Sequence, residues 1–473
     1  MLRWWRTIGL PLALSAGLLA GLSDTAAAPN ASSAPIDASR PTHDEAPVSA
    51  ATRVATAARA TDIVPGTVNR SSLNLRATYD VSVWLSYASR QLAVDSRMAI
   101  VNTSGDSIDR LELNAIAARL GGLRIRSAVV DGRAVSPSID DQTIVVPLGG
   151  VLPAGGTVHV RLRTRSWLRT SLTGSNWMYT KANGILSAYR WLPWVSRPIP
   201  FNRPNHGDPF ITPVSPEVRV KVTTDRTMVI AATGDRVSHS GLTQTFLAHN
   251  VRDFTLTASP FYRTGSVTLG SKLVRVYYRS GAPATAMLSA ARRALSRIAS
   301  LLDASYPYAT YKVVQSSGRY GMESPGLTWI PTGVGTANLT YLVFHETAHQ
   351  WFYSLVGSNQ VYEPFSDEAA ADFMARYALS MRRGSRCSTA RLDLSIYRYS
   401  SSCYYEVIYI QGGNFLDDLR HRMGSTAFWR GVRAYVAANR WKIAPTKRLL
   451  DTLDDATSLN LVPHYEPRFP RLY

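Results

Sequence analysis

Two histidines with a glutamate between them form the segment of this sequence whose chemistry is most specific. His345 and His349 are four residues apart, so on a helix their imidazoles share one face and can reach a single ion. Glu346 follows the first histidine, where its carboxylate can act as a general base toward a water molecule. The spacing therefore predicts a hydrolytic metal site. The alternative is an ordinary helix face exposed to solvent.

A catalytic zinc ion usually has three protein ligands and one open position, so a third ligand is needed. Eighteen residues stand between His349 and Glu368, which lies at the start of a second predicted helix capped by Ser366. Two helices joined by a loop would bring this carboxylate against the histidines. Asp372, one turn further on, could accept a hydrogen bond from the outer nitrogen of a ligand histidine. A helix-surface role is the alternative for Asp372.

Two segments outside the metal motif contain further candidates. Gly321-Met322-Glu323 lies upstream of the motif beside a predicted strand, and a carboxylate at the rim of a zinc cleft could bind a peptide's α-amino group. Tyr409, in a predicted helix over 404–422, could donate its hydroxyl to the oxyanion of peptide hydrolysis. Two glycines follow it at a cost of about 1 kcal/mol each relative to alanine, which indicates close approach by another element. Taken alone, Glu323 also fits a turn or surface acid, and Tyr409 a packed core residue.

The elements that must position these groups divide the chain into two structured parts. From 67 to 263 the sequence alternates apolar and polar residues between turn signals, which predicts an antiparallel β domain. From 264 to 473, two strands and an amphipathic helix over Met287 to Leu302 precede the metal helices and a helical end. This order predicts a multidomain α+β fold.

The N-terminal region has a different composition. Residues 1–28 combine Arg3 and Arg6, an apolar run and small residues, as in a secretory signal peptide, so we expect a secreted protein. An uncleaved anchor is the alternative. Residues 29–66 are rich in Ala, Pro, Ser and Thr, and we expect a disordered linker.

The chain has two cysteines, Cys387 and Cys403, which flank a loop rich in serine and arginine. In an exported protein this pair predicts a disulfide beside the metal helices. Two free thiols are the alternative.

The net charge of the chain bears on whether the protein binds anionic partners. The formal net charge is +19, but all except six of the 52 basic residues are arginines scattered along the chain, with no dense basic run. We therefore expect no nucleic-acid partner and at most a weak association with anionic polymers of the cell surface.

Together, the motifs between about 300 and 425 resemble the membrane alanine aminopeptidase family of gluzincin zinc peptidases. The resemblance implies one Zn²⁺ ion and a saddle-like β domain packed on a thermolysin-like catalytic domain. The roles that it implies are zinc binding by His345, His349 and Glu368, base catalysis by Glu346, substrate binding by Gly321, Met322 and Glu323, and oxyanion stabilisation by Tyr409. The expected function is a zinc aminopeptidase acting on peptides with a free N-terminus. A zinc endopeptidase and a non-catalytic surface protein on the same fold are the alternatives.

The sequence departs from this family at a few positions. Ser324 stands where the family usually has asparagine, Gln411 replaces a common lysine, and Ala369-Ala370 replaces a glycine and an aromatic residue. We expect these changes to affect substrate preference and turnover more than zinc binding. The sequence also stops at Tyr473, which predicts a more open cleft than in relatives with a further helical domain.

Overall fold

The structure is a computed structural model that describes residues 61–473, all of which belong to one compact unit. The predicted signal peptide and most of the predicted linker therefore lie outside the described residues. Residues 61–66, which we expected to belong to the linker, already contact the sheets. Val64 pairs with Val151, and the Asp62 carboxylate accepts a hydrogen bond from the Thr157 amide at 2.7 Å.

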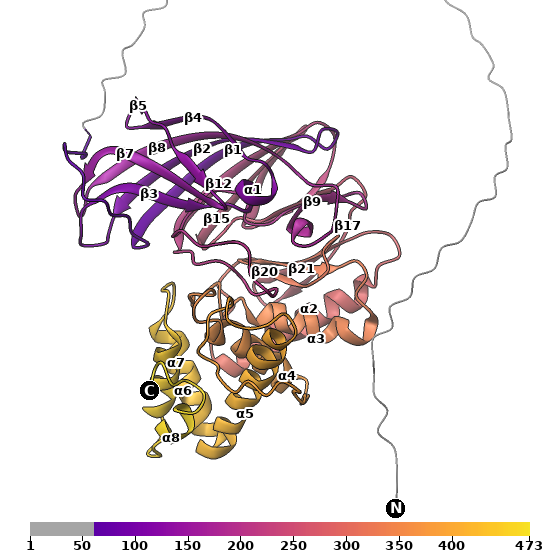
Figure 1. The fold of residues 1–473 in the computed structure, drawn as a ribbon. Coiled ribbons are helices and arrows are strands. Elements are labelled where there is room, and N and C mark those ends of the chain that lie inside the picture. Colours follow the sequence, from indigo (N-terminus) through magenta and orange to yellow (C-terminus); the bar gives the residue numbers. More distant parts are fainter. Residues whose placement is uncertain (1–60) are drawn as a thin grey trace, which may run out of the picture. The chain divides into compact units, whose positions relative to one another are not determined.

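The largest sheet has eight strands in the order β14-β15-β12-β1-β2-β8-β4-β5 (Figure 1). Its strands are β1 (Leu75–Leu85), β2 (Gln91–Asn102), β4 (Arg124–Val130), β5 (Arg133–Ala134), β8 (Thr157–Trp167), β12 (Ser215–Thr224), β14 (Asp235–Ser240) and β15 (Thr243–Val251). Buried and exposed residues alternate along β1, β2 and β8, so one face packs on a core and the other meets solvent. Neighbouring strands are antiparallel as predicted, except that β1 and β12 are parallel.

Two smaller sheets cover the buried face of the eight-stranded sheet and share its hydrophobic core. One has the order β11-β3-β7-β6, and the other β13-β16-β10-β9. Their strands are β3 (Ile108–Asn114), β6 (Ser138–Asp140), β7 (Thr143–Leu152), β9 (Tyr179–Ala182), β10 (Ile185–Ala188), β11 (Trp194–Val195), β13 (Val229–Ala232) and β16 (Leu256–Ser259). A short helix, α1 (Ile116–Leu120), and a 3₁₀ turn (Asn176–Met178) complete this part.

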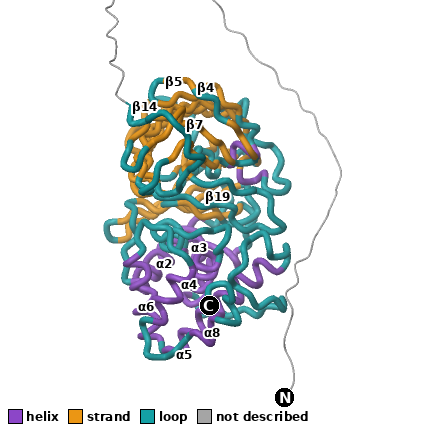
Figure 2. Tube along the Cα trace, turned by 60° about the vertical axis from the view of Figure 1, so that its left-hand side comes forward, coloured by secondary structure: helices purple, strands orange, loops and turns teal. Residues whose placement is uncertain are grey.

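A five-stranded sheet, ordered β17-β18-β19-β21-β20, lies between the β-rich part and the helices (Figures 1 and 2). Its strands are β17 (Arg263–Leu269), β18 (Lys272–Tyr278), β19 (Thr310–Ser316), β20 (Met322–Ser324) and β21 (Leu327–Pro331). The central strands β18, β19 and β21 are parallel, and helix α2 (Ala284–Leu302) connects the first two. Val313 and Val314 pack into different cores, because successive side chains of a strand point to opposite faces. The sheet is therefore buried on both sides.

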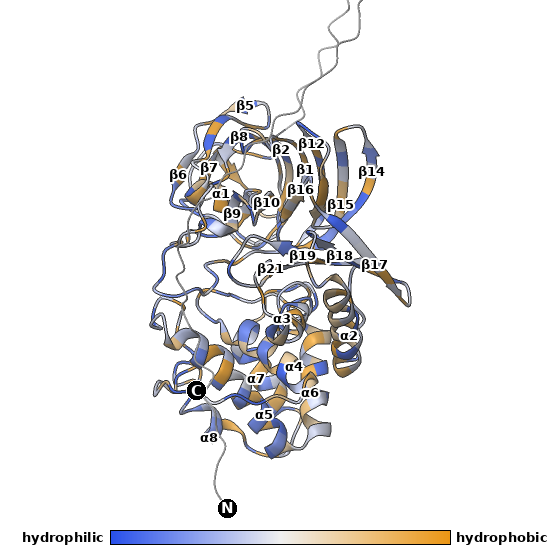
Figure 3. Ribbon diagram, turned by 90° about the vertical axis from the view of Figure 1, so that its right-hand side faces the viewer, coloured by the Kyte–Doolittle hydropathy of each residue, from blue (hydrophilic) through white to orange (hydrophobic). Residues whose placement is uncertain are grey.

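The C-terminal part is helical. Its elements are α3 (Thr336–Ala348), a π-helical turn (Phe365–Ala369), α4 (Ala370–Ala378), a second π-helical segment (Tyr405–Gln411), α5 (Gly412–Met423), α6 (Ser425–Ala438), α7 (Thr446–Asp454) and α8 (Val462–Tyr465). Figure 3 shows that hydrophobic and hydrophilic residues are interspersed along these helices, and the buried apolar side chains form the second hydrophobic core. The predicted α+β fold class is confirmed. Among residues 61–473, no helix is long and apolar enough to cross a membrane.

A buried arginine ties the β-rich part to the helical part. Arg252 follows β15 and is 1% exposed. Its guanidinium donates hydrogen bonds to the carbonyls of Thr212 (3.2 Å), Ser354 (3.3 Å) and Lys442 (2.7 Å). Burial lowers the pKa of this side chain to about 10. A Cβ on Gly357 would lie 2.4 Å from its Cζ, so a glycine is needed there for the arginine to fit.

Candidate zinc site

Helix α3 carries the first histidine and the proposed base, and the second histidine lies at its C-terminal end. His345 and Glu346 are in the last turn of α3, and His349 is its C-cap with helical backbone angles (φ −63°, ψ −11°). The two imidazoles therefore keep the expected helical spacing. The helix ends at Ala348. In the sequence, Phe344, Ala348, Trp351, Phe352 and Leu355 have helical spacing, which predicts a longer helix. The amide of Ser354 instead bonds to the carbonyl of His349 in an irregular turn.

Three side-chain atoms meet at mutual distances that suit one metal ion. Glu368 Oε2 lies 3.2 Å from His345 Nε2 and 3.4 Å from His349 Nε2, and the two Nε2 atoms are 3.3 Å apart. Ligands about 2.0–2.1 Å from a tetrahedral zinc ion are separated by about 3.3–3.4 Å. All three side chains are buried. The residues present therefore fit a zinc ion.

The orientation of His349 leaves its Nε2 free to bind a metal. Its Nδ1 lies 2.9 Å from Asp367 Oδ1 and 3.0 Å from the carbonyl of Phe352. Both neighbours are acceptors, so Nδ1 must carry the ring proton and Nε2 the lone pair. The sequence pattern assigned no role to Asp367, although this residue directly precedes the predicted ligand Glu368.

The structure shows no hydrogen bond between Asp372 and either candidate ligand histidine. Its carboxylate accepts a hydrogen bond from the Tyr341 hydroxyl and pairs with Arg376 at 2.6 Å. Nδ1 of His345 has no hydrogen-bond partner within residues 61–473. Asp367 is the acid that accepts a hydrogen bond from the outer nitrogen of a candidate ligand histidine, and that histidine is His349.

The two other candidate site residues of the helical part, Glu368 and Tyr409, lie in π-helical segments, which are frequent at functional sites. Glu368 lies in the first and Tyr409 in the second. The predicted Ser366 cap is absent, because the Ser366 hydroxyl has no hydrogen-bond partner in the described part of the chain. A Cβ on Gly412 would lie 2.6 Å from that of Ala369. The close approach that the glycines predict is therefore present.

Tyr409 stacks on the first histidine. The ring of Tyr409 lies 5.4 Å from that of His345 with an interplanar angle of 19°. Burial, reinforced by the nearby Glu368 carboxylate, raises the pKa of the Tyr409 hydroxyl well above 10. The side chain therefore remains a hydrogen-bond donor at the site at all physiological pH values.

Glu346 and Glu323 face the same space from different elements. Each has a carboxylate oxygen within 4.8 Å of a ring nitrogen of His349. Burial raises the pKa of Glu346 well above its usual range and that of Glu323 to about 7. A Cβ on Gly321 would lie 2.0 Å from Glu346 Oε1, so a side chain there would displace the Glu346 carboxylate. Met322 is buried in β20 next to these two residues.

A glutamine that the sequence did not mark connects the site's acids. Gln360 Nε2 donates to Glu323 Oε1 at 3.0 Å and to Asp367 Oδ2 at 2.8 Å. Its carbonyl oxygen accepts a hydrogen bond from Arg190 at 2.9 Å. Arg190 is 5% exposed and also lies 3.7 Å from Glu323. This bridge therefore links the candidate amine-binding acid to the acid that orients His349.

A loop of the β-rich part supplies one wall of the site. His206 stacks on Tyr320 with ring centroids 5.2 Å apart and lies 6.3 Å from the ring of Tyr409. Asp208 is within 4.8 Å of Asp367 and Glu368. Burial, together with neighbouring acids, raises the pKa of Asp208 well above its usual range. The sequence around this loop is rich in proline and aromatic residues, but no function was assigned to it.

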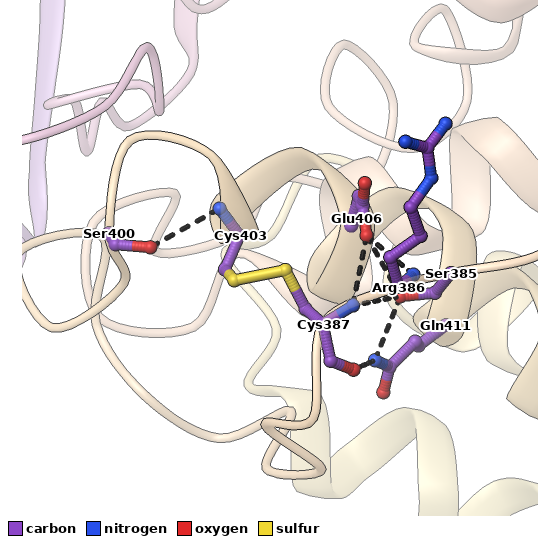
Figure 4. Close-up of a disulfide and its surroundings, with 7 residues drawn as sticks. All are labelled: Ser385, Arg386, Cys387, Ser400, Cys403, Glu406 and Gln411. Atoms are coloured by element: carbon purple, nitrogen blue, oxygen red, sulfur yellow. Dashed lines mark hydrogen bonds between the residues drawn. A yellow bond between two sulfur atoms is a disulfide. The ribbon is translucent and has the colours of Figure 1, made fainter.

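The predicted disulfide between Cys387 and Cys403 is present, with Cα atoms 5.7 Å apart (Figure 4). The Glu406 carboxylate accepts hydrogen bonds from the amides of Arg386 and Cys387. Gln411, which replaces the family's lysine, donates to the carbonyl of Cys387 at 2.8 Å. The disulfide loop therefore braces the π-helical segment that carries Tyr409.

The fold matches solved structures of zinc peptidases, whereas no family model and no curated protein sequence matches the chain. The M1 zinc metallopeptidase from Deinococcus radiodurans is 22% identical, with a TM-score of 0.64 over 84% of this chain and 93% of that one. A variant of it bound to a Tyr-Ser-Ala substrate is 20% identical, with a TM-score of 0.64 over 87% and 97%. A two-domain variant bound to L-arginine is 20% identical, with a TM-score of 0.63 over 84% and 93%. At these identities the likeness establishes the fold: that of a two-domain M1 peptidase.

Proposed function

We propose that this chain, which has the fold of the two-domain M1 zinc metallopeptidases, is a zinc-dependent aminopeptidase. The observation that carries the proposal is the triangle of His345 Nε2, His349 Nε2 and Glu368 Oε2, whose sides of 3.2–3.4 Å suit one zinc ion. These two ring nitrogens and the carboxylate oxygen lie close together in a buried space. A zinc ion in this site would acidify water and polarise a peptide carbonyl.

Glu346 is the proposed general base. It is buried beside the triangle, and its Oε2 has no hydrogen-bond partner within the described residues. A buried carboxylate with a raised pKa can accept a proton from water and return it to a leaving amine. Tyr409, a protonated donor stacked on His345, would stabilise the negative charge that develops on the carbonyl oxygen.

Glu323 is the proposed anchor for the α-amino group of the substrate. It lies on the edge strand β20, and a carboxylate oxygen of it falls within 4.8 Å of His349 and Glu346. Asp208 and Asp367 make the surroundings still more acidic, which favours a cationic ammonium group. Holding the ammonium this close to the zinc ligands would leave room for one residue before the cleaved bond. The Tyr-Ser-Ala peptide bound in one of the similar structures agrees with such a substrate.

Two assays test this proposal. The purified protein should contain one zinc ion per chain, and a chelator should abolish hydrolysis of aminoacyl chromogenic substrates. Free peptides should be cleaved, whereas the same peptides with an acetylated N-terminus should not. Equal cleavage of both forms would instead indicate an endopeptidase. Bound zinc without any turnover would indicate a non-catalytic protein on this fold.

We also propose that the enzyme is exported. The disulfide Cys387–Cys403 suits an oxidising compartment, where such bonds form and persist. The composition of residues 1–28 supports a cleaved signal peptide, and an uncleaved anchor remains the competing prediction. Determining the N-terminal residue of the protein isolated from its host would distinguish the two.

A further inference from the structure

The solvent-facing side of the eight-stranded sheet concentrates positive charge that comes from four strands, β2, β4, β8 and β12. Three cross-strand rows run through Asp80, Ser82 and Trp84 of β1. The cations in these rows and in the adjoining bulge of β4 are Arg97, Arg124, Arg126, Arg161, Arg163, Arg165, Arg219 and Lys221. The rows contain two carboxylates, Asp80 and Asp95. We call this surface the basic face.

The pairing of strands places like charges directly opposite each other on the basic face. Arg97 of β2 is the register partner of Arg161 of β8, and Arg165 of β8 is the partner of Arg124 of β4. Like charges in directly opposed positions destabilise a sheet. Asp95 compensates in part, because it forms ion pairs with Arg161 at 2.5 Å and Arg163 at 3.1 Å. The other six cations form no ion pair with any residue in the range 61–473.

The centre of the basic face is a shallow groove of about 540 Å³. Arg126, Arg163 and Arg165 line one side of it, and Lys221 and Trp84 the other. Asp95 lies between the two sides and is paired with Arg163. Outward residues two apart on a strand are separated by about 6.8 Å, and neighbouring strands by about 4.8 Å. A linear polymer that carries a charge every few ångströms could therefore meet one cation after another along this groove.

We infer that the basic face binds a linear, phosphate-bearing polymer without bases. Arginine forks match phosphate oxygens in geometry as well as charge. A single-strand nucleic-acid site would need several aromatic platforms, whereas Trp84 is the one exposed aromatic residue in these rows. A membrane surface would require a larger apolar patch than Trp84 provides. Charge complementarity therefore favours the polymer.

Binding at the basic face would leave the zinc site accessible. The face is the exposed side of the sheet, and the buried side packs against the core that adjoins the five-stranded sheet. In Figure 1 the strands β1, β2 and β8 lie at the end of the described unit opposite helices α4–α8. The polymer would thus hold the protein in place while peptides enter elsewhere. Such binding does not require peptidase activity.

The test compares two triple variants that each lose three positive charges. The first replaces Arg126, Arg165 and Lys221 by glutamine; all three line the groove and form no ion pair among the residues that the structure describes. The matched control carries Arg292→Gln, Arg297→Gln and Arg440→Gln, at exposed positions in the helical part. Thermal unfolding should show both variants to be folded, because no substituted side chain is buried.

Binding of fluorescent long-chain polyphosphate is then measured by anisotropy at several salt concentrations. We expect the groove variant to bind at least 10-fold more weakly at low salt, with a salt slope lower by about 2. The control should bind within threefold of the unsubstituted protein. If both variants bound polyphosphate equally weakly, net charge alone would explain the loss of binding, and the inference would be overturned. A failure to bind polyphosphate would also overturn the inference. So would binding of single-stranded DNA or anionic vesicles that is tighter than binding of polyphosphate and that Trp84→Ala abolishes.

Discussion

Gln360 offers a test of whether the acids around the zinc site act as a connected set. Its side-chain amide donates to Glu323 and Asp367 and accepts from Arg190, so three contacts at 2.8–3.0 Å converge on one buried residue. The variant Gln360→Leu keeps a similar volume and removes all three. Its two carboxylate neighbours would then face each other without the shared donor.

The size of the effect follows from those contacts. A hydrogen bond to a charged group contributes about 1.5–3 kcal/mol, and about 1.4 kcal/mol corresponds to a factor of ten in rate. If one such contribution is lost from the orientation of Glu323, kcat/KM for free peptides should fall by about 10- to 100-fold. Most of the change should appear in KM, because Glu323 is the proposed anchor of the substrate. Zinc content should not change, since Asp367 keeps its bond to His349.

The assay measures kcat and KM on aminoacyl substrates together with zinc content. Gln244→Leu is the matched control: it removes a buried glutamine that donates to the carbonyl of Met228 within the β-rich part. It should cost similar stability and leave kcat/KM intact. The reasoning would be refuted if Gln360→Leu retained kcat/KM within twofold. Loss of zinc from the variant would also refute it, because the bridge would then act on the metal and not on substrate binding.

Further outcomes are expected for four other changes. Glu346→Gln should keep zinc and lose about 10²–10⁴ in kcat, and Tyr409→Phe should lose about 10²–10³; both are measured by steady-state kinetics and metal analysis. Burial lowers the pKa of Lys312 to about 8, so the unfolded chain binds more protons above that pH. Stability relative to Lys312→Met should therefore rise by about 2 kcal/mol from pH 8 to 10 in urea unfolding. Replacing Cys387 and Cys403 by serine should remove about 3 kcal/mol of stability, given their separation of 16 residues.

Each of these predictions has an outcome that contradicts it. Full turnover by Glu346→Gln would rule out the base assignment, and an unchanged kcat for Tyr409→Phe would return that tyrosine to a packing role. A pH-independent stability difference for the Lys312 variant would mean that the buried amine titrates normally. Unaltered urea unfolding of the double serine variant would show that the loop is ordered without its disulfide.

The sequence predicted the parts of the site that depend on local spacing. His345 and His349 fall on one helical face because the helix repeat requires it, and their spacing survived even though α3 ends at Ala348. The alternation of buried and exposed residues along β1 and β8 could also be predicted, because apolar residues recur at every second position of a half-buried strand. The domain boundaries and the roles of the individual site residues stay predictions.

What the sequence could not predict depends on contacts between distant segments. Gln360 and Asp208 come from loops with no periodicity, so only the folded chain brings them to the acids. Asp372 contacts Tyr341 and Arg376, and these contacts cannot be read from its spacing after Glu368. A π-helical turn shifts the register of the residues around it, and periodicity arguments assume 3.6 residues per turn. Arg190 could be counted as a cation but not located beside Glu323.

The buried guanidinium of Arg252 restricts how this protein can be shortened. A fragment that begins at β17 would lose the three hydrogen bonds of this arginine and would expose Val314, Leu327 and Trp329, which now pack in the core of the β-rich part. It would also lack the wall that His206 provides. Expression of the helical half by itself should therefore yield insoluble material. A useful minimal enzyme must retain both halves, and a library for altered specificity can vary the loop around residue 206 without touching the metal ligands.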